Sequence, residues 1–373
     1  MSNKNVIIII PTYNESAIIE KTIIEVFEAV STINDWQISV LVFDSASADN
    51  TASIVKALQQ TYPKLLFRSE IKKTGLGSAY HQAMRIALDE LSADVVFEFD
   101  ADLSHQPCYI APMLEQLQDA DVVVGSRYVS GGEIPNNWGF HRKILSVAGN
   151  WIARAVLTCR YKDFTSGFRA TRKDVLQKAL PDVFLSNQYA YKLELLWRLH
   201  KNKARVREWP IIFVDRTEGE SKLPTNSIGD ALRVIFTLRY YELKRYINMC
   251  IVGVSGATVQ FLLYNVLSQM MSPFSATQWA VSAAILNNYI LNNIFTFKDK
   301  KETENKQKVK ILALFLVYSV FIIQLQSYWI KFGISFFGRG ALKENLMLLC
   351  GVGLGSILNY FVYSRVVWRK TTS

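Results

Sequence analysis

The last third of the chain contains four long stretches that carry almost no charged residues. They cover residues 247–271, 275–297, 311–330 and 346–364. A helix rises 1.5 Å per residue, so about 20 apolar residues cross the roughly 30 Å hydrocarbon core of a bilayer. Each stretch has about that length. The sequence therefore predicts an all-α membrane domain over residues 246–373, with four transmembrane helices.

The first 227 residues follow a different pattern, in which short β-branched runs alternate with helical stretches. Strands are expected at 6–10, 38–43, 65–68 and 95–99, followed in turn by helices at 16–30, 49–60, 78–91 and 108–118. Strands that are apolar throughout are typical of a parallel sheet covered on both faces. We therefore expect a Rossmann-like α/β domain with a mostly parallel sheet over residues 1–227.

Residues 228–245 are predicted to form a juxtamembrane interfacial helix, because they end in tyrosine and basic residues. Residues 141–157 have helical apolar spacing flanked by basic residues, which fits either a helix in the headgroup layer or a helix on the core.

Lys and Arg outnumber Asp and Glu by 42 to 32. No basic block with interleaved aromatic residues stands in the soluble part, so the expected anionic partner is a membrane and not nucleic acid.

Polar residues follow three of the expected strands at the point where each strand ends. They are Pro11, Tyr13 and Glu15 after the first, Asp44 and Ser45 after the second, and Asp100, Ala101 and Asp102 after the fourth. Ligands of such sheets bind at the carboxyl ends of the strands. The spacing of Asp100 and Asp102 suits Mg²⁺ or Mn²⁺ carrying a diphosphate. A solvated loop, or a helix cap before Pro107, is the alternative interpretation.

The segment from Lys72 to Gly77 has part of a dinucleotide-binding glycine pattern. It lacks the third glycine and does not follow the first strand, which excludes a nicotinamide site. A loop that admits a nucleotide and a plain turn both stay open. The four cysteines are far apart in the sequence and have no CxxC or histidine pairing, so neither a zinc site nor a disulfide framework is indicated.

Seven motifs occur in order along the soluble part. They are PTYNE (11–15), D-x-x-S-x-D-x-T (44–51), GLGSAY (75–80), DADLSHQP (100–107), GSRY (125–128), DFTSGFRATRKDVL (163–176) and DRTEGESKL (215–223). Together they resemble the family 2 glycosyltransferases of the dolichyl-phosphate mannose synthase group. The resemblance implies a GT-A fold and an inverting transfer of mannose from GDP-mannose to dolichyl or another polyprenyl phosphate.

The resemblance also implies which residues bind the donor and the metal. The implied nucleotide-sugar site comprises Pro11, Tyr13, Glu15, Asp44, Ser45, Asp100, Ala101, Asp102 and Arg127, and the implied Mg²⁺ or Mn²⁺ site comprises Asp100, Asp102 and Ser104. Two positions depart from the family. A second Asp often stands where this chain has Ser45, which leaves the choice of GDP or UDP open. Some members have Gln as a metal ligand at the position where this chain has Ser104. In this chain, water would take the place of that Gln ligand.

The acceptor that the resemblance implies sets what else the site must contain. A phosphate monoester, with a second pKa of about 6, is already an anion at neutral pH, so no general base is required. Cationic side chains must instead bring it to the anionic donor. We assign the acceptor phosphate to Arg142, Ser146, Arg216 and Lys222, and the catalytic roles to Asp102, Arg127, Arg216 and Lys222.

The second and fourth expected spans end alike, with Asn288-Tyr289 and Asn359-Tyr360 at the same offset from a terminal aromatic residue. This pattern resembles the GtrA-like four-helix membrane family. The asparagines Asn287, Asn288, Asn292 and Asn293 are costly in lipid unless they face other helices, so they predict interhelical contacts or a polar passage for a lipid headgroup.

Loop 298–310 and the tail from residue 365 are basic, which predicts that both termini and the catalytic domain lie in the cytoplasm.

Two rival functions stay open at this point. One is a polyprenyl-phosphate transferase that uses UDP-glucose or a UDP-aminosugar. The other is a flippase for lipid-linked sugars, whose soluble domain only binds. The membrane helices alone are also compatible with a simple anchor. The sequence leaves the prenyl chain length and the oligomeric state undetermined.

Overall fold

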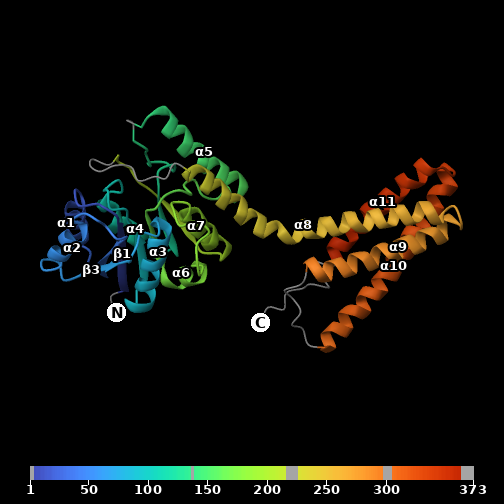
Figure 1. The fold of residues 1–373 in the computed structure, drawn as a ribbon, viewed down its shortest axis with the longest axis horizontal. Helices are drawn as coiled ribbons and strands as arrows, with labels where there is room; N and C mark the ends of the chain where they lie inside the picture. The colour runs from blue at the N-terminus through green and yellow to red at the C-terminus, as the bar shows by residue number, and fades with distance from the viewer. Residues whose placement is uncertain (1–3, 136–137, 216–225, 297–304, 363–373) are drawn as a thin grey trace. The chain divides into compact units, whose positions relative to one another are not determined.

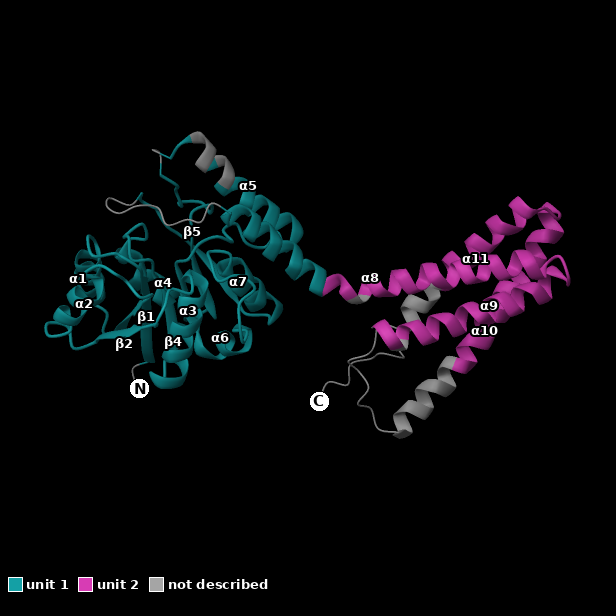
Figure 2. Ribbon diagram, in the orientation of Figure 1, with its two compact units in different colours: residues 1–241 teal, residues 242–373 magenta. Residues whose placement is uncertain are grey.

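The structure is a computed structural model and describes residues 4–135, 138–215, 226–296 and 305–362 (Figure 1). The chain divides into two compact units, Met1–Tyr241 and Glu242–Ser373 (Figure 2).

A seven-stranded sheet forms the centre of the first unit, in the order β3-β2-β1-β4-β6-β5-β7. The strands are β1 Lys4–Thr12, β2 Trp36–Asp44, β3 Leu65–Ser69, β4 Val95–Glu98, β5 Val122–Ser126, β6 Arg169–Arg172 and β7 Val206–Pro210. Strands β1 to β4 pair in parallel, as do β5 and β7, whereas β6 is antiparallel to both β4 and β5. The expected mostly parallel sheet is confirmed.

Helices cover both faces of this sheet (Figure 1). They are α1 Ile19–Val30, α2 Thr51–Leu58, α3 Leu76–Arg85 with the π-helix η1 Ile86–Glu90, the 3₁₀-helix η2 Pro107–Tyr109, α4 Ile110–Gln116, α5 Phe140–Val156, α6 Lys173–Ala179 and α7 Tyr191–Lys201. Successive residues of β1 point to opposite faces. Ile7 and Ile9 pack in one core, and Val6 and Ile8 pack in the other. A strand that is apolar throughout is thus buried on both sides.

Helix α1 begins three residues later than the sequence pattern predicts, because side chains hold the preceding loop. The amide of Glu15 donates to Thr51 Oγ1 at 2.9 Å, and the amide of Ser16 donates to Asp49 Oδ2 at 3.0 Å. These contacts hold the segment that follows Pro11 in place at the end of β1 and keep its side chains beside the second strand.

The second unit is helical, with an apolar cluster and polar contacts in its interior and many large apolar side chains exposed on its outside. Its helices are the C-terminal part of α8 Ser227–Leu267, then α9 Pro273–Leu291 with the π-helix η3 Asn292–Thr296, α10 Asn305–Phe337 and α11 Ala341–Val362. Gln260 Nε2 donates to Gln326 Oε1 at 2.7 Å in the interior, whereas Val254 and Val317 are about 70% exposed. Among the described residues, Tyr246–Leu267 and Leu316–Phe337 are long and apolar enough to cross a bilayer. Helix α8 runs unbroken through the segment where an interfacial helix and a first span were expected.

Candidate active site

Asp100 lies just beyond the end of β4 and is held by residues from two helices. Tyr80 of α3 donates its hydroxyl to Asp100 Oδ1 at 3.1 Å, and Lys192 Nζ of α7 lies 3.4 Å from Asp100 Oδ2. Burial raises the pKa of Asp100, but the charges of Lys192 and His105 and the hydrogen bonds from Tyr80 and Lys192 together lower it below its usual value. The side chain is 23% exposed, so an ionised carboxylate faces solvent at the end of the strand.

Asp102 is oriented by the residue two positions later. Ser104 donates to Asp102 Oδ1 from its amide at 3.1 Å and from its hydroxyl at 2.6 Å. Ser104, expected as a metal ligand, thus contacts the carboxylate beside it. Leu103 between them adopts a left-handed backbone with φ of 53°, which permits this tight turn.

Carboxylate oxygens, such as those of Asp100 and Asp102, are together with phosphate oxygens the usual ligands of Mg²⁺. Buried His105 Nδ1 lies 3.6 Å from Asp100 Oδ2 and has no hydrogen-bond partner among the residues described. Burial lowers the pKa of His105 to about 4, which keeps the imidazole neutral at pH 7. Within the described ranges, no three His, Cys, Asp or Glu side chains form a metal site by themselves. A diphosphate would have to complete the coordination.

Asp44 ends β2 and joins it to β1. Thr12 Oγ1 donates to Asp44 Oδ1 at 2.9 Å, and the amide of Ser47 donates to Asp44 Oδ2 at 2.9 Å. The amide of Asn14 in turn donates to Ser47 Oγ at 2.8 Å. Hydrogen bonds therefore connect the PTYNE segment to the second strand end. Asp44 ends β2, Asp100 and Asp102 follow β4, and both strands pair in parallel with β1 between them. The three carboxylates, which we call the carboxylate edge, therefore lie at the same edge of the sheet.

The other expected donor-binding residues lie around this edge. Pro11 is buried within β1, and Thr22 of α1 donates to the carbonyl oxygen of Ala101 at 2.7 Å. Lys73 Nζ lies 3.4 Å from the centroid of the Tyr13 ring, a cation–π contact. The structure therefore brings the loop from Lys72 to Gly77 beside the PTYNE segment.

The glycines of that loop are required by close packing. A Cβ on Gly75 would lie 2.3 Å from the carbonyl oxygen of Asn187, and one on Gly77 would lie 2.6 Å from that of Ser186. Gly75 also has a φ of 110°, which side chains disfavour. The glycine pattern is explained by the approach of α3 to residues 186–188.

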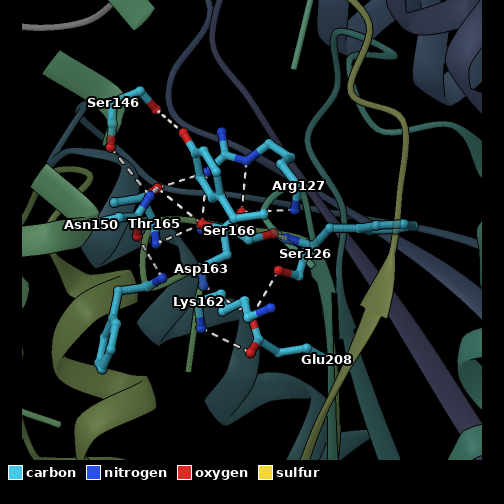
Figure 3. Close-up of polar contacts among 12 residues, drawn as sticks. Ser126, Arg127, Ser146, Asn150, Lys162, Asp163, Thr165, Ser166 and Glu208 are labelled. Carbon is cyan, nitrogen blue, oxygen red and sulfur yellow. Dashed lines mark hydrogen bonds and ion pairs between the residues drawn. The ribbon is translucent and has the colours of Figure 1, made fainter. Parts of the chain in front are cut away.

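Arg127 follows β5 and forms a buried ion pair. Its Nε and Nη2 each donate to Asp163 at 2.8 Å, and Nη2 also donates to Thr165 Oγ1 at 2.6 Å (Figure 3). Burial lowers the pKa of Arg127, but the charge of Asp163, its hydrogen bonds with Arg127 and the charges of Tyr128 and Asp100 together raise it above its usual value. The guanidinium is thus a permanently charged group fixed in one orientation.

Ser146, predicted to bind the acceptor, belongs to the same hydrogen-bonded group as Arg127. Its hydroxyl lies 2.7 Å from the Tyr128 hydroxyl, and Asn150 Nδ2 donates to Thr165 Oγ1 at 3.2 Å (Figure 3). Helix α5, which carries Ser146, is thereby joined to the segment beyond β5. Phe213 connects this group with His105, because its ring centroid lies 5.3 Å from Arg127 Cζ and 5.1 Å from the His105 ring centroid.

Three expected cations fall outside what the structure describes. Arg216 and Lys222 lie in residues 216–225, and the side chain of Arg142 is not described. The roles given to these residues, and to the whole set of site residues, stay predictions.

Sequence reasoning missed three residues that the structure brings to the site. Asp163 and His105 stand inside the quoted motifs DFTSGFR and DADLSH, so the motifs contained a signal that was not used. Lys192 had no such signal. It lies in a helix of alternating leucines and polar residues, where a lysine usually marks a solvent-facing position.

Comparisons with known proteins agree with both units. The glycosyl transferase family 2 profile matches residues 7–180, and the GtrA/DPMS transmembrane domain profile matches residues 248–368. A dolichol-phosphate mannosyltransferase of Pyrococcus furiosus is 33% identical over 97% of this chain and 98% of its own length.

Two relatives match only the first part of the chain. An undecaprenyl-phosphate mannosyltransferase of Micrococcus luteus is 37% identical over 61% of this chain and 90% of its own. A polyprenol monophosphomannose synthase of Mycolicibacterium smegmatis is 34% identical over 61% of this chain and 83% of its own. With the sheet, the carboxylate edge and a relative matched over nearly its full length, the chain belongs to the family 2 glycosyltransferases of the polyprenyl-phosphate mannosyltransferase group, joined to a GtrA/DPMS membrane domain.

Proposed function

We propose that this protein transfers mannose from GDP-mannose to a polyprenyl phosphate, with inversion at the sugar carbon and with Mg²⁺ or Mn²⁺ as cofactor. The observation that carries the proposal is the 33% identity to a dolichol-phosphate mannosyltransferase over 98% of that relative's length. The match extends through both the catalytic and the membrane unit, so the whole arrangement is shared and not one domain alone.

On the donor side, Asp100 and Asp102 would hold the metal, and Asp44 would contact the nucleotide. The metal would neutralise charge that develops on the departing nucleotide diphosphate. Asp102 is prepared for this by the two hydrogen bonds from Ser104, which leave its carboxylate in one orientation before the donor arrives. A preoriented ligand lowers the reorganisation needed when the donor binds.

On the acceptor side, no general base is needed because the lipid phosphate is already ionised. Arg127 supports a cationic acceptor site, because Asp163 fixes its guanidinium near the carboxylate edge. We propose that Arg142, Ser146, Arg216 and Lys222 complete the acceptor site. These cations would bring one anion up to another without transferring a proton.

We further propose that the second unit crosses the membrane four times, at residues 247–271, 275–297, 311–330 and 346–364. The basic loop 298–310 supports a topology with both termini and the catalytic unit on the cytoplasmic side. That side also holds soluble nucleotide sugars, so donor and acceptor would meet at one membrane surface.

A donor panel tests the proposal. Purified full-length protein in detergent is mixed with a polyprenyl phosphate, Mg²⁺ or Mn²⁺, and GDP-mannose, UDP-glucose or a UDP-aminosugar. We expect a mannolipid from GDP-mannose that disappears with EDTA. A glycolipid formed only from a UDP-sugar would reassign the donor, and absence of product from every donor would refute the transferase.

A further inference from the structure

Lys192 is a buried lysine in the second position of α7. Its side chain is 7% exposed, and its Nζ lies 3.4 Å from Asp100 Oδ2 and 5.6 Å from the centroid of the Tyr189 ring. A charged ammonium is costly to bury unless it is paired. Its partner here is a carboxylate that belongs to the donor site, so the lysine acts on that site through Asp100.

Gly167 provides the space for this lysine. A Cβ built on Gly167 would lie 2.1 Å from Lys192 Nζ and 2.5 Å from its Cε. The backbone of Gly167 is not in the left-handed region, so conformation does not require glycine there. The residue instead leaves a passage through which the ammonium reaches Asp100. Two segments of the chain, distant in sequence, therefore combine to place one positive charge behind the carboxylate edge.

That charge changes what the carboxylate edge can bind. Asp44, Asp100 and Asp102 together bring three negative charges, which repel a nucleotide diphosphate and attract a free divalent cation. The ammonium of Lys192 offsets one of them at Asp100 Oδ2, while Tyr80 holds Oδ1. It therefore opposes binding of a cation alone and favours binding of the diphosphate.

We propose that Lys192 is a positioning residue that makes the donor site select the cation together with the nucleotide diphosphate, instead of the free cation. This inference rests on the proposed function, since it assumes that the carboxylate edge binds a nucleotide diphosphate and a metal. Lys192 touches neither substrate and works by fixing Asp100 and setting the local charge. Loss of its charge should change the two binding steps in opposite directions.

Four variants separate charge from structure. Lys192→Gln removes the charge but keeps a hydrogen-bond donor, and Lys192→Met keeps only the length of the side chain. Gly167→Ala keeps the lysine and pushes its ammonium away from Asp100. Lys201→Met, on the same helix but over the Trp197 ring, is the matched control for loss of one positive charge.

The full-length protein in detergent at pH 8 is titrated with Mn²⁺ alone, followed by electron paramagnetic resonance. It is also titrated with GDP in EDTA, followed by calorimetry, with UDP measured in parallel. We expect Lys192→Gln and Lys192→Met to bind Mn²⁺ on the order of tenfold more tightly and GDP on the order of tenfold more weakly. Gly167→Ala should shift both affinities in the same senses by less, and Lys201→Met should match the wild type.

The opposite signs distinguish this role from a structural one. If the Lys192 variants bind both Mn²⁺ and GDP more weakly, or bind both as the wild type does, the proposal is wrong. Wild-type protein that binds neither GDP nor UDP, in EDTA or with Mn²⁺ present, would refute the proposed function instead, whereas wild-type protein that binds nucleotide beside Lys192 variants that bind Mn²⁺ no more tightly than the wild type would refute only the role of Lys192.

Discussion

Two carboxylates stand two residues apart at the end of β4 and have opposite environments. Glu98 is 1% exposed, and Arg169 binds both its oxygens, from Nε at 2.6 Å and from Nη2 at 2.9 Å. Tyr191 adds a third hydrogen bond to Glu98 at 2.9 Å. Asp100 is 23% exposed, and its contacts with Tyr80 and Lys192 are longer, at 3.1 and 3.4 Å.

The difference is the one expected between a structural carboxylate and a carboxylate that binds a ligand. Glu98 has its oxygens saturated by a bidentate guanidinium, so it joins β4 to β6 and offers nothing to a ligand. Asp100 is held ionised but keeps an exposed face. A carboxylate that binds a metal or a nucleotide must be available in this way, so we expect these two acidic residues to have different roles.

The largest effect is expected from the loss of Asp102, a carboxylate of the carboxylate edge, while Glu98 is left in place. Asp102→Ala should lower the rate of mannolipid formation about a thousandfold or more at any Mg²⁺ concentration, because a metal ligand is lost. Turnover is measured with radiolabelled GDP-mannose, and the melting temperature serves as the folding control. Retained activity at saturating metal would remove Asp102 from the metal site.

The next effect concerns stability and addresses Glu98. Arg169→Met leaves a buried carboxylate without its guanidinium, so we expect the free energy of unfolding to fall by about 3–5 kcal/mol. Chemical denaturation of the full-length protein in detergent measures it. The double variant Glu98→Leu with Arg169→Met should recover much of the loss. A single variant as stable as the wild type would show that this pair does not hold the sheet.

A smaller loss is expected at the Arg127–Asp163 ion pair, beside the proposed acceptor site. Asp163→Asn weakens the hydrogen bonds that fix Arg127 and should cost about 2 kcal/mol of stability. The KM for polyprenyl phosphate should rise more than the KM for the donor, because the guanidinium loses its fixed orientation. Steady-state kinetics with each substrate varied separately tests this. An equal rise in both KM values would argue against an acceptor role for Arg127.

The smallest effect is expected at Asp49, which holds the loop before α1. Burial raises its pKa, but hydrogen bonds from Thr51 and Ser16 lower it to about 2 from 3.8. The ionised form is therefore favoured by folding, and its contribution is complete above pH 3.8 and lost as the pH falls through about 2.

Asp49→Asn should accordingly destabilise the protein by about 1 kcal/mol at pH 7, and by less near pH 3. Thermal unfolding of wild type and variant at the two pH values measures the difference. A difference that grows as the pH falls would contradict the assignment.

Much of the first unit was predictable because its signals are local. Strand β1 contains five consecutive apolar residues with a proline near its end, and the acidic residues stand at or just beyond the ends of the strands. The mostly parallel sheet and the positions of Asp44, Asp100 and Asp102 follow from that pattern.

The ion pairs were not predictable in the same way. Arg127 and Asp163 are 36 residues apart, and Lys192 and Asp100 are 92 apart. No periodicity relates such positions. The pairing of β5 with β6 brings the first pair together, and the contact of α7 with β4 brings the second pair together. The late start of α1 has a similar cause, since side chains of the loop before α2 hold the amides of Glu15 and Ser16.

The most direct test compares Glu98→Gln with Asp100→Asn, measuring mannolipid formation per folded molecule and melting temperature in the same preparations. The difference in exposure predicts that Asp100→Asn loses at least about a hundredfold in turnover with little change in melting temperature. Glu98→Gln should lower the melting temperature by about 5–10 °C and keep turnover within about threefold of the wild type. If Asp100→Asn remains active while Glu98→Gln folds normally but is inactive, the carboxylate edge has been assigned to the wrong residue.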